Sequence, residues 1–346
     1  ISAFYSGLSH HTLRLGIGYH DEDVHKIINW RNSGPSPSGQ PIPPGSPLIE
    51  LTDTPYAPIP EKRRSNYYGF IQDEWNLASN WQLTTGLRYD YYTQSGSTFN
   101  PRLALVWQLD PRLSTKWLYG RAFRVAHLNE LYALSSTIQQ GNPDLAPEKM
   151  ATWEWAFDYL LTEKTHLSLN MFTYQWDDII DAYPLANTAI VMTQNGGEQK
   201  GRGFELEARW KLTSKMSLLA NYAFQDTKDS AGQEAANAPH HKGYLRSDWL
   251  IYPNWYLDAQ IIWIADRPRG YGDPRPQIAD YTTVDLTLRH KDIRRKHWDL
   301  ALGVRNLFDE DVREPSPGPN ARGVIAIPND FPLAGRNYFL ELRYRF

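Results

Sequence analysis

Apolar and polar residues alternate one by one along many segments of this chain. In the segment 204–212, every even position is apolar and every odd position is charged. The segment 337–346 repeats the pattern, with an aromatic residue or leucine at each even position. Because successive side chains of a β-strand point to opposite faces of a sheet, this period of two predicts strands with one apolar and one polar face.

Similar segments recur along the chain and predict about 14 strands in all. We expect these strands near 11–27, 65–77, 81–94, 100–109, 114–123, 150–161, 165–178, 201–212, 216–227, 239–251, 255–266, 280–291, 297–308 and 336–346. Their connections are short at 78–80, 110–112, 162–164, 213–215 and 252–254, and long near 28–64, 124–148, 184–199, 228–238, 267–278 and 309–335. Short turns at one end of a sheet and long loops at the other are typical of outer-membrane β-barrels.

Composition separates a membrane barrel from a soluble β-protein such as a propeller. The chain of 346 residues has 13 Trp, 21 Tyr and 12 Phe, yet its mean hydropathy of −0.57 is typical of a soluble protein. A transmembrane barrel reconciles the two, because lipid-facing and lumen-facing residues alternate and aromatic residues gather at both membrane interfaces. We therefore predict an all-β fold, an antiparallel transmembrane β-barrel.

The barrel prediction assigns a direction to each side chain. An Arg or Lys that faces lipid at the bilayer midplane costs on the order of 2–4 kcal/mol. The charged residues Glu205, Asp285, Arg305 and Arg343 are therefore expected to face inward. The apolar residues of the same set of strands are expected to face outward: Leu206, Leu257, Ile261, Leu286, Leu302, Leu340 and Leu342.

Several functions are excluded by what the sequence lacks. It has no Cys and a net charge of only −3, so we expect no disulfide framework and no nucleic-acid partner. We find no Ser-His-Asp arrangement, P-loop or HExxH motif, and therefore expect no enzyme, metal site or cofactor. The first residues have neither an initiator Met nor a signal sequence, so either a signal peptide has been removed or the chain is a fragment of a longer protein.

Several stretches, taken in order, resemble one family. Residues 123–132, Phe-Arg-Val-Ala-His-Leu-Asn-Glu-Leu-Tyr, look like the family segment "FRAPSLNELY", and 141–148 are similar to "GNPDLKPE". Residues 70–75, 100–104 and 305–309 and the terminal strand closing on Phe346 are further family-like pieces. With matches from about 65 to 346, the chain resembles the TonB-dependent outer-membrane receptors.

The resemblance implies a barrel of about 22 strands, plugged by an amino-terminal domain that contacts TonB. Residues 1–346 would be a partial barrel domain that holds the last 14 of those strands. The expected location is the outer membrane of a Gram-negative bacterium, in contact with its lipid and lipopolysaccharide. The barrel-assembly machinery is expected to recognise the final strand through Phe346.

The resemblance also implies active transport energised through TonB. We expect the substrate to be an iron chelate, first of all a ferric siderophore. A haem or cobalamin receptor of the same family is an alternative, and a passive porin or an outer-membrane barrel enzyme is another.

Candidate ligand contacts lie in or next to the predicted long loops. His127 lies between two boxes that resemble those flanking the haem-ligating histidine of haem receptors, although Ala126 replaces the proline of the first box; a loop histidine without a ligand is the alternative. Aromatic and basic residues suit an aromatic, anionic chelate through stacking and charge pairing. The full set of candidates is Arg124, His127, Tyr132, Trp176, Tyr183, Arg267, Arg269 and Tyr271. The neighbours His240 and His241 should point to opposite faces of a strand, which disfavours joint chelation.

Overall fold

The computed structural model describes residues 1–54, 56, 59–135, 139–185, 190–293, 297–319 and 323–344. The chain divides into two compact units. The first unit comprises 1–105, 118–152 and 175–198, and the second comprises 106–117, 153–174 and 199–346. Phe346, and with it the expected contact with the assembly machinery, lies outside the described residues.

Fourteen strands of eight residues or more run through the described part of the chain, one for each strand that the alternation predicts. They are β2 (His11–Val24), β5 (Lys62–Ala78), β6 (Trp81–Tyr92), β7 (Gly96–Asp110), β8 (Leu113–Arg124), β11 (Glu148–Thr162), β12 (Thr165–Pro184), β13 (Val191–Lys211), β14 (Met216–Asp229), β15 (His241–Tyr252), β16 (Trp255–Ala265), β17 (Tyr281–Asp292), β18 (Trp298–Arg305) and β21 (Asn337–Tyr344). The shorter elements are β1 (Ser2–Tyr5), β3 (Trp30–Arg31), β4 (Ile49–Glu50), α1 (Leu128–Tyr132), β9 (Leu134–Ser135), β10 (Gln139–Gln140), β19 (Arg313–Glu314) and β20 (Phe331–Pro332).

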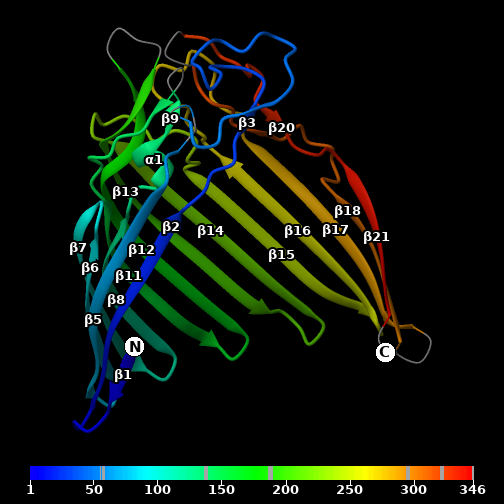
Figure 1. The fold of residues 1–346 in the computed structure, drawn as a ribbon. Helices are drawn as coiled ribbons and strands as arrows, with labels where there is room; N and C mark the ends of the chain where they lie inside the picture. The colour runs from blue at the N-terminus through cyan, green and yellow to red at the C-terminus, as the bar shows by residue number, and fades with distance from the viewer. Residues whose placement is uncertain are drawn as a thin grey trace. The chain divides into compact units, whose positions relative to one another are not determined.

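In the second unit, consecutive strands pair edge to edge. One antiparallel series consists, in order, of β13, β14, β15, β16, β17, β18 and β21. Figure 1 shows this series from green to red. The turn between β15 and β16 is tight because Asn254 adopts a left-handed φ of 65°. Since the series is antiparallel, the long connections 230–240, 266–280 and 306–336 all leave from the same end of the strands.

The register of this series puts the apolar and charged residues on opposite faces. Leu302 is the partner of both Leu288 and Leu340, and Ile261 is the partner of Leu245 and Val284. Following the same ladder, all seven residues expected to face outward share one face, and the four charged residues share the other. The apolar face is open, with 50% of Leu302 exposed. The predicted separation of the two faces is confirmed.

In the first unit, β2 pairs with β1 and β5, and β5 pairs with β6, all antiparallel. The same alternation holds, because exposed Leu15 and Ile71 are partners on one face, while Arg14 and Gln72 are partners on the other. A compact hydrophobic cluster lies beside α1 and consists of Ala126, Leu131, Leu145 and Ile180. Most of the buried apolar residues in the described part of the chain lie in the connections between strands, as three of these four do.

The predicted loop 184–199 is wrong, because β13 already begins at Val191 and β12 continues to Pro184. The polar run 193–199 has no apolar alternation, so its sequence does not indicate a strand. Two glycines make the strand possible here. A Cβ on Gly196 would come within 2.8 Å of the Tyr183 ring, and one on Gly197 within 2.8 Å of Ile179. Among the residues that the structure describes, no helix is long and apolar enough to span a bilayer.

The two faces lead to a test in the membrane for which the fold is predicted. Leu302→Arg would place a charge on the apolar face, and we expect it to destabilise the folded protein by about 2–4 kcal/mol. Thr287→Arg is the matched control, because Thr287 is the partner of Gly303 on the charged face. The folded fraction of each variant in outer membranes can be measured by heat-modifiable gel mobility. Equal losses for both variants would contradict the assignment of the faces.

Candidate functional site

The segment that follows β8 folds back into one helical turn. The backbone N–H of His127 donates to a carboxylate oxygen of Glu130 at 2.7 Å, so the acidic side chain caps the first turn of α1. Ala126 and Leu131 on the inner side of this turn are buried against Leu145 and Ile180. The short helix is therefore stabilised by the buried apolar cluster on one side and by the Glu130 cap at its start.

Arg124 lies at the centre of a charged network beneath α1. Its guanidinium donates to both carboxylate oxygens of Glu148, at 2.9 and 2.6 Å, and to both of Glu130, at 3.1 and 2.8 Å. Glu148, whose side chain is only 3% exposed, also accepts from the backbone N–H of Ile180 at 2.7 Å. A paired bidentate arginine of this kind fixes the direction as well as the distance of its partners.

Two further contacts fasten the same segment. The buried Arg64 donates to the carbonyl oxygen of Ala126 at 2.5 Å and pairs with Glu22 at 2.6 Å. The amide of Asn195 accepts from the N–H of Ala146 at 2.8 Å and donates to its carbonyl at 2.9 Å. The loop 125–147 is thus held against β5 by Arg64 and against β13 by Asn195, and Arg64 is itself held by Glu22 of β2.

The structure brings the predicted residues Arg124, His127 and Tyr132 together around α1. Arg124 is occupied by two carboxylates, whereas His127 is exposed at the start of the helix. Tyr132 is half-buried, with the Lys62 ammonium 4.8 Å from its ring centre. Trp176 and Tyr183 are half-buried residues of β12. A ligand contact for any of these residues stays a prediction.

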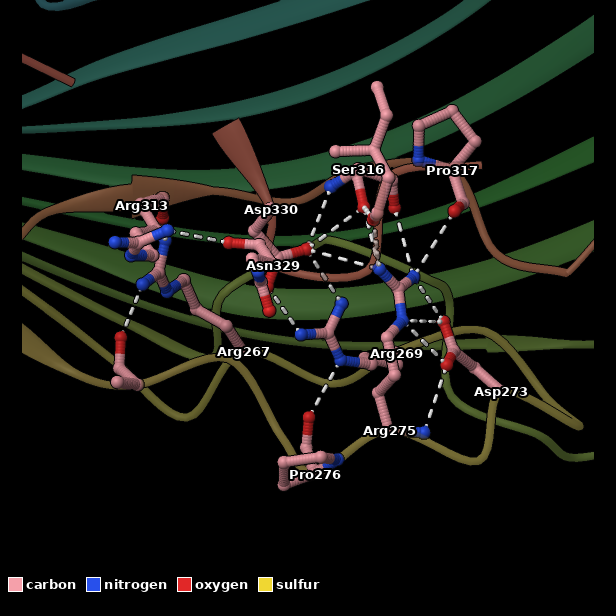
Figure 2. Close-up of polar contacts among 12 residues, drawn as sticks. Arg267, Arg269, Asp273, Arg275, Pro276, Arg313, Ser316, Pro317, Asn329 and Asp330 are labelled. Atoms are coloured by element: carbon pink, nitrogen blue, oxygen red, sulfur yellow. Dashed lines mark hydrogen bonds and ion pairs between the residues drawn. The ribbon is translucent and has the colours of Figure 1, made fainter. Parts of the chain in front are cut away.

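A second cluster, in the second unit, joins the loops 266–280 and 306–336. Arg269 forms a bidentate pair with Asp330, at 3.0 and 2.5 Å, and donates through Nε to the carbonyl of Pro276 at 2.6 Å. Only 9% of either charged side chain is exposed. Figure 2 shows the two guanidinium groups of Arg269 and Arg275 side by side, facing the segment that carries Ser316 and Asp330.

Arg275 fills the rest of this cluster. It pairs with Asp273 of its own loop at 2.6 Å and donates to the Ser316 hydroxyl at 2.6 Å and to the Pro317 carbonyl at 3.2 Å. Ser316 completes the arrangement, because its N–H donates to Asp330 at 3.0 Å. We call Arg269, Asp273, Arg275, Ser316 and Asp330 the loop clamp, since every member contacts another and the two loops are joined through them.

The remaining candidates of this region differ in accessibility. Arg267 is buried and donates to the carbonyls of Arg313, at 2.9 Å, and of Ala279. Its guanidinium also lies 5.0 Å from the Tyr281 ring centre. Tyr271 is 85% exposed at the tip of its loop. The two arginines predicted as ligand contacts, Arg267 and Arg269, therefore hold protein groups, and their role toward a ligand stays a prediction, as does that of Tyr271.

The charges of the clamp shift the acidities of its carboxyl groups. The Arg275 guanidinium lowers the pKa of Asp273 from 3.8 to about 2. Hydrogen bonds from Arg269 hold the pKa of Asp330 well below its usual range, against the opposing effect of burial. Both carboxyl groups are therefore ionised throughout the physiological pH range, and the cluster contains two positive and two negative charges.

The histidines do not converge on a metal site. His241 is hydrogen-bonded to the Tyr222 hydroxyl, and the adjacent His240 to Asp266, each at 2.7 Å. Their different partners agree with the expected opposite directions of the two rings. Within the described ranges, no group of three or more His, Cys, Asp or Glu residues is placed to hold a metal ion.

Sequence reasoning did not single out Glu148, Asp273, Arg275, Ser316 or Asp330. Glu148 ends the family-like stretch 141–148, so its position was a usable signal. Asp330 and Ser316 lie in a Pro-rich connection with no periodicity, and their arginine partners are more than 40 residues away. The sequence of this connection carries no signal that would pair them.

Comparisons with known proteins agree on one family. Residues 2–307 match the family described as TonB dependent receptor-like, beta-barrel. The iron-regulated outer membrane virulence protein of Vibrio cholerae is 29% identical over 306 residues, which are 82% of this chain and 45% of that protein. The vitamin B12 transporter of Vibrio cholerae is 25% identical over 292 residues, 82% of this chain and 43% of that protein.

Solved structures share the fold. The ferric enterobactin receptor of Pseudomonas aeruginosa, in complex with enterobactin, has a TM-score of 0.75 and 20% identity, with 96% of this chain and 51% of that chain covered. The predicted all-β, antiparallel fold of outer-membrane barrel type is confirmed by this likeness. The chain spans about half the length of the proteins that it matches.

The network under α1 gives a prediction for the first unit. Glu148→Ala removes both the bidentate partner of Arg124 and the acceptor of the Ile180 N–H, and we expect a local loss of about 2–3 kcal/mol. Lys149→Ala is the matched control, because its pair with Asp178 is partly exposed and such pairs contribute about 0–1 kcal/mol. Limited proteolysis of the loop 125–147 should become faster in the first variant alone. Equal cleavage rates would refute the structural role of Glu148.

The loop clamp gives a pH prediction. Because the pKa of each carboxyl group is lowered on folding, its stabilising effect is complete well above the ordinary aspartate pKa of 3.8. The contribution of Asp273 is lost as the pH falls through about 2, and that of Asp330 is lost at still lower pH. We expect amide hydrogen exchange in the loops 266–280 and 306–336 to stay slow at pH 4.5 and to accelerate as the pH approaches 2, after correction for the intrinsic exchange rate. Asp330→Asn should exchange fast at both pH values. A clamp already open at pH 4.5 would contradict the assignment.

Proposed function

We propose that this chain, which belongs to the TonB-dependent receptor family, is the barrel part of a receptor that imports a ferric siderophore with energy delivered through TonB. Membership, based on the match over residues 2–307, confirms the resemblance seen in the sequence. The chain is accordingly an outer-membrane protein of a Gram-negative bacterium. The family is one of transport receptors and not of enzymes.

The proposal of an iron chelate as the substrate rests on the similarity to the iron-regulated relative. Its name states that its amount responds to iron, and at 29% identity over 82% of this chain it is more similar than the vitamin B12 transporter at 25%. Regulation of a transport receptor by iron supports iron or its chelates as the cargo. The siderophore receptor that shares the fold is consistent with that cargo.

The construction of the loops supports a binding role at their end of the strands. Internal ion pairs hold both loop clusters in one conformation, so the exposed His127 and Tyr271 project from fixed backbones. A preformed loop surface loses less conformational entropy when a ligand binds than a flexible one does. We propose that His127, Tyr132, Trp176 and Tyr183 provide ligand contacts in the first unit, and that Tyr271 does so, separately, in the second. Arg124, Arg267 and Arg269 act mainly by holding these loops.

Two other substrates remain candidates within the family, cobalamin and haem. Cobalamin is favoured by the similarity to the vitamin B12 transporter. Haem is favoured by the exposed position of His127, whose imidazole can approach an iron centre from the start of α1. A passive porin is not supported, since the family couples transport to TonB.

The remaining partners follow from the same proposal. An amino-terminal region that contacts TonB would complete the receptor, and the outward apolar face would contact lipid and lipopolysaccharide. We also propose that the barrel-assembly machinery recognises the carboxyl-terminal strand.

Uptake of radiolabelled iron by cells that express the full-length receptor tests the proposal. We expect transport of ⁵⁵Fe-enterobactin or of another ferric siderophore to require TonB, because an energised receptor moves its ligand inward only when coupled. The control is the same strain without tonB. Transport that continues unchanged without TonB would contradict the proposal.

The same cells separate the ligand classes. Haem and radiolabelled cyanocobalamin are offered beside the ferric siderophore, and growth or uptake is compared for wild type and His127→Ala. A haem receptor should lose haem binding in the variant, because an axial ligand is removed. A siderophore receptor should be affected little by His127→Ala and more by Trp176→Ala or Tyr183→Ala, through lost stacking. Exclusive uptake of cyanocobalamin would exclude the siderophore.

A further inference from the structure

The strands β18 and β21 meet in a close contact between a glycine and an aromatic ring. Gly303 and Phe339 are direct partners on the charged face, and a Cβ on Gly303 would overlap the Phe339 ring. The Arg305 guanidinium lies over the same ring, 5.3 Å from its centre. The ring therefore occupies the space that a side chain on Gly303 would need.

The same contact occurs twice between β2 and β5 in the first unit. Gly16 is the direct partner of Phe70, and Gly18 is the direct partner of Tyr68. A Cβ on either glycine would overlap the ring opposite to it. The Arg88 guanidinium lies 4.0 Å from the centre of the Tyr68 ring. We call these three contacts, each a glycine and the ring of its direct partner, the glycine–ring pairs.

The glycine–ring pairs join strands that are separated by long connections. β2 and β5 are joined by 25–61, and β18 and β21 by 306–336, the two longest connections between the fourteen long strands. A tight turn such as that at Asn254 fixes the register of its strands. A long connection does not, because its closure costs almost the same free energy when it gains or loses two residues. A similar contact, between Gly201 and Tyr174, joins β12 to β13, whose connection is shorter.

The alternation of apolar and polar residues excludes only half of the incorrect registers. A slip by one residue exchanges the faces, but a slip by two returns every side chain to its own face. A two-residue slip of β21 would bring Phe339 opposite Ala301 or Arg305, where a side chain fills the space that is open at Gly303. In β2 and β5, a slip of two residues in either direction leaves one of the two rings without a glycine opposite to it. Of these registers, only the native one gives every ring a glycine.

We propose that the glycine–ring pairs select the register of β2 with β5 and of β18 with β21. A glycine inside a strand otherwise weakens it, because it adds backbone entropy to the unfolded chain and brings no side chain to pack. Here the glycine excludes every register in which another residue faces the ring. The stagger between strands sets the shape of a barrel. The glycine–ring pairs therefore help to fix the shape of the polar face that the loops surround.

Disulfide formation between introduced cysteines in the full-length receptor reads the register directly. The chain has no Cys, so an introduced pair is the only one within it. Leu302 and Leu340 are direct partners, and Leu302→Cys/Leu340→Cys should form a disulfide when outer membranes are oxidised. The diagonal pairs Leu302→Cys/Tyr338→Cys and Leu302→Cys/Leu342→Cys lie about 7–8 Å apart in the native register, too far for a disulfide. Each becomes a direct pair after a slip of two residues in one direction.

Gly303→Val places a side chain where the Phe339 ring lies. We expect it to lower the ratio of native to diagonal disulfides at least about fivefold, because crowding of a packed site favours another arrangement. The exchange variant Gly303→Phe/Phe339→Gly should restore the ratio, since it moves the ring to β18 and the glycine to β21 in the same register. Rescue by exchange separates register selection from a general loss of stability.

Gly243→Val is the matched control. Gly243 is also the direct partner of an aromatic residue, Trp263, but the turn at Asn254 aligns β15 with β16. The native disulfide of these strands, formed by Leu245→Cys/Ile261→Cys, should keep its wild-type yield in this variant.

An unchanged ratio of disulfides in Gly303→Val would overturn the proposal, and so would an equal fall of the native disulfide in Gly243→Val. Failure of the exchange variant to restore the ratio would count against it in the same way. Heat-modifiable mobility shows which variants fold. If Gly303→Val does not fold, Phe339→Ala decides, because it removes the ring without crowding and must also lower the ratio. If neither folds, the proposal requires that the exchange variant does.

Discussion

The antiparallel hydrogen-bond ladder between neighbouring strands is the constraint on which the rest of the structure depends. Once two strands are in register, the face of every side chain follows from whether its position is odd or even. A shift by one residue would exchange Leu302 with Gly303 and bring Arg305 to the apolar face. The register therefore places charged and apolar side chains on opposite faces along the whole series from β13 to β21. The loops are not subject to this constraint on side-chain direction.

The loops achieve order by different means. Strand side chains on the apolar face are largely exposed. Most buried apolar residues of the described chain lie in the connections between strands, and four buried residues form the small cluster beside α1. Away from that small core, fixed geometry comes from charged groups that satisfy one another, as Arg124 does with Glu148 and Arg269 does with Asp330. Ion pairs with little exposure have well-defined geometry because few alternative partners are within reach. Such pairs hold a loop in one conformation where a hydrophobic core is too small to do so.

The strands were predictable from the sequence because their signal is local. Alternation over some ten residues is visible in β13 or β21 without knowledge of any neighbour, and all fourteen long strands were found in this way. The start of β13 was missed because Gly196 and Gly197 form a strand through the packing of Tyr183 and Ile179, which is not a periodic property.

The candidate site was predictable only in part. Arg124, Arg267 and Arg269 were recognised as loop arginines, but a sequence does not say whether a guanidinium is turned toward solvent or toward a carboxylate 24 or 61 residues away. The exposed positions of His127 and Tyr271 agree with the expectation of accessible loop residues.

The loop clamp also limits how these two loops can diverge among relatives or be exchanged by engineering. Replacing 266–280 alone would leave Asp330 and Ser316 without the guanidinium groups that satisfy them, and replacing 306–336 alone would leave Arg269 without its carboxylate. An unpartnered ionic group with so little exposure costs several kcal/mol. The two loops therefore depend on each other. Chimeric receptors should fold when both loops are exchanged together and should be destabilised when only one is exchanged. Substitutions in one loop should be accompanied by substitutions in the other.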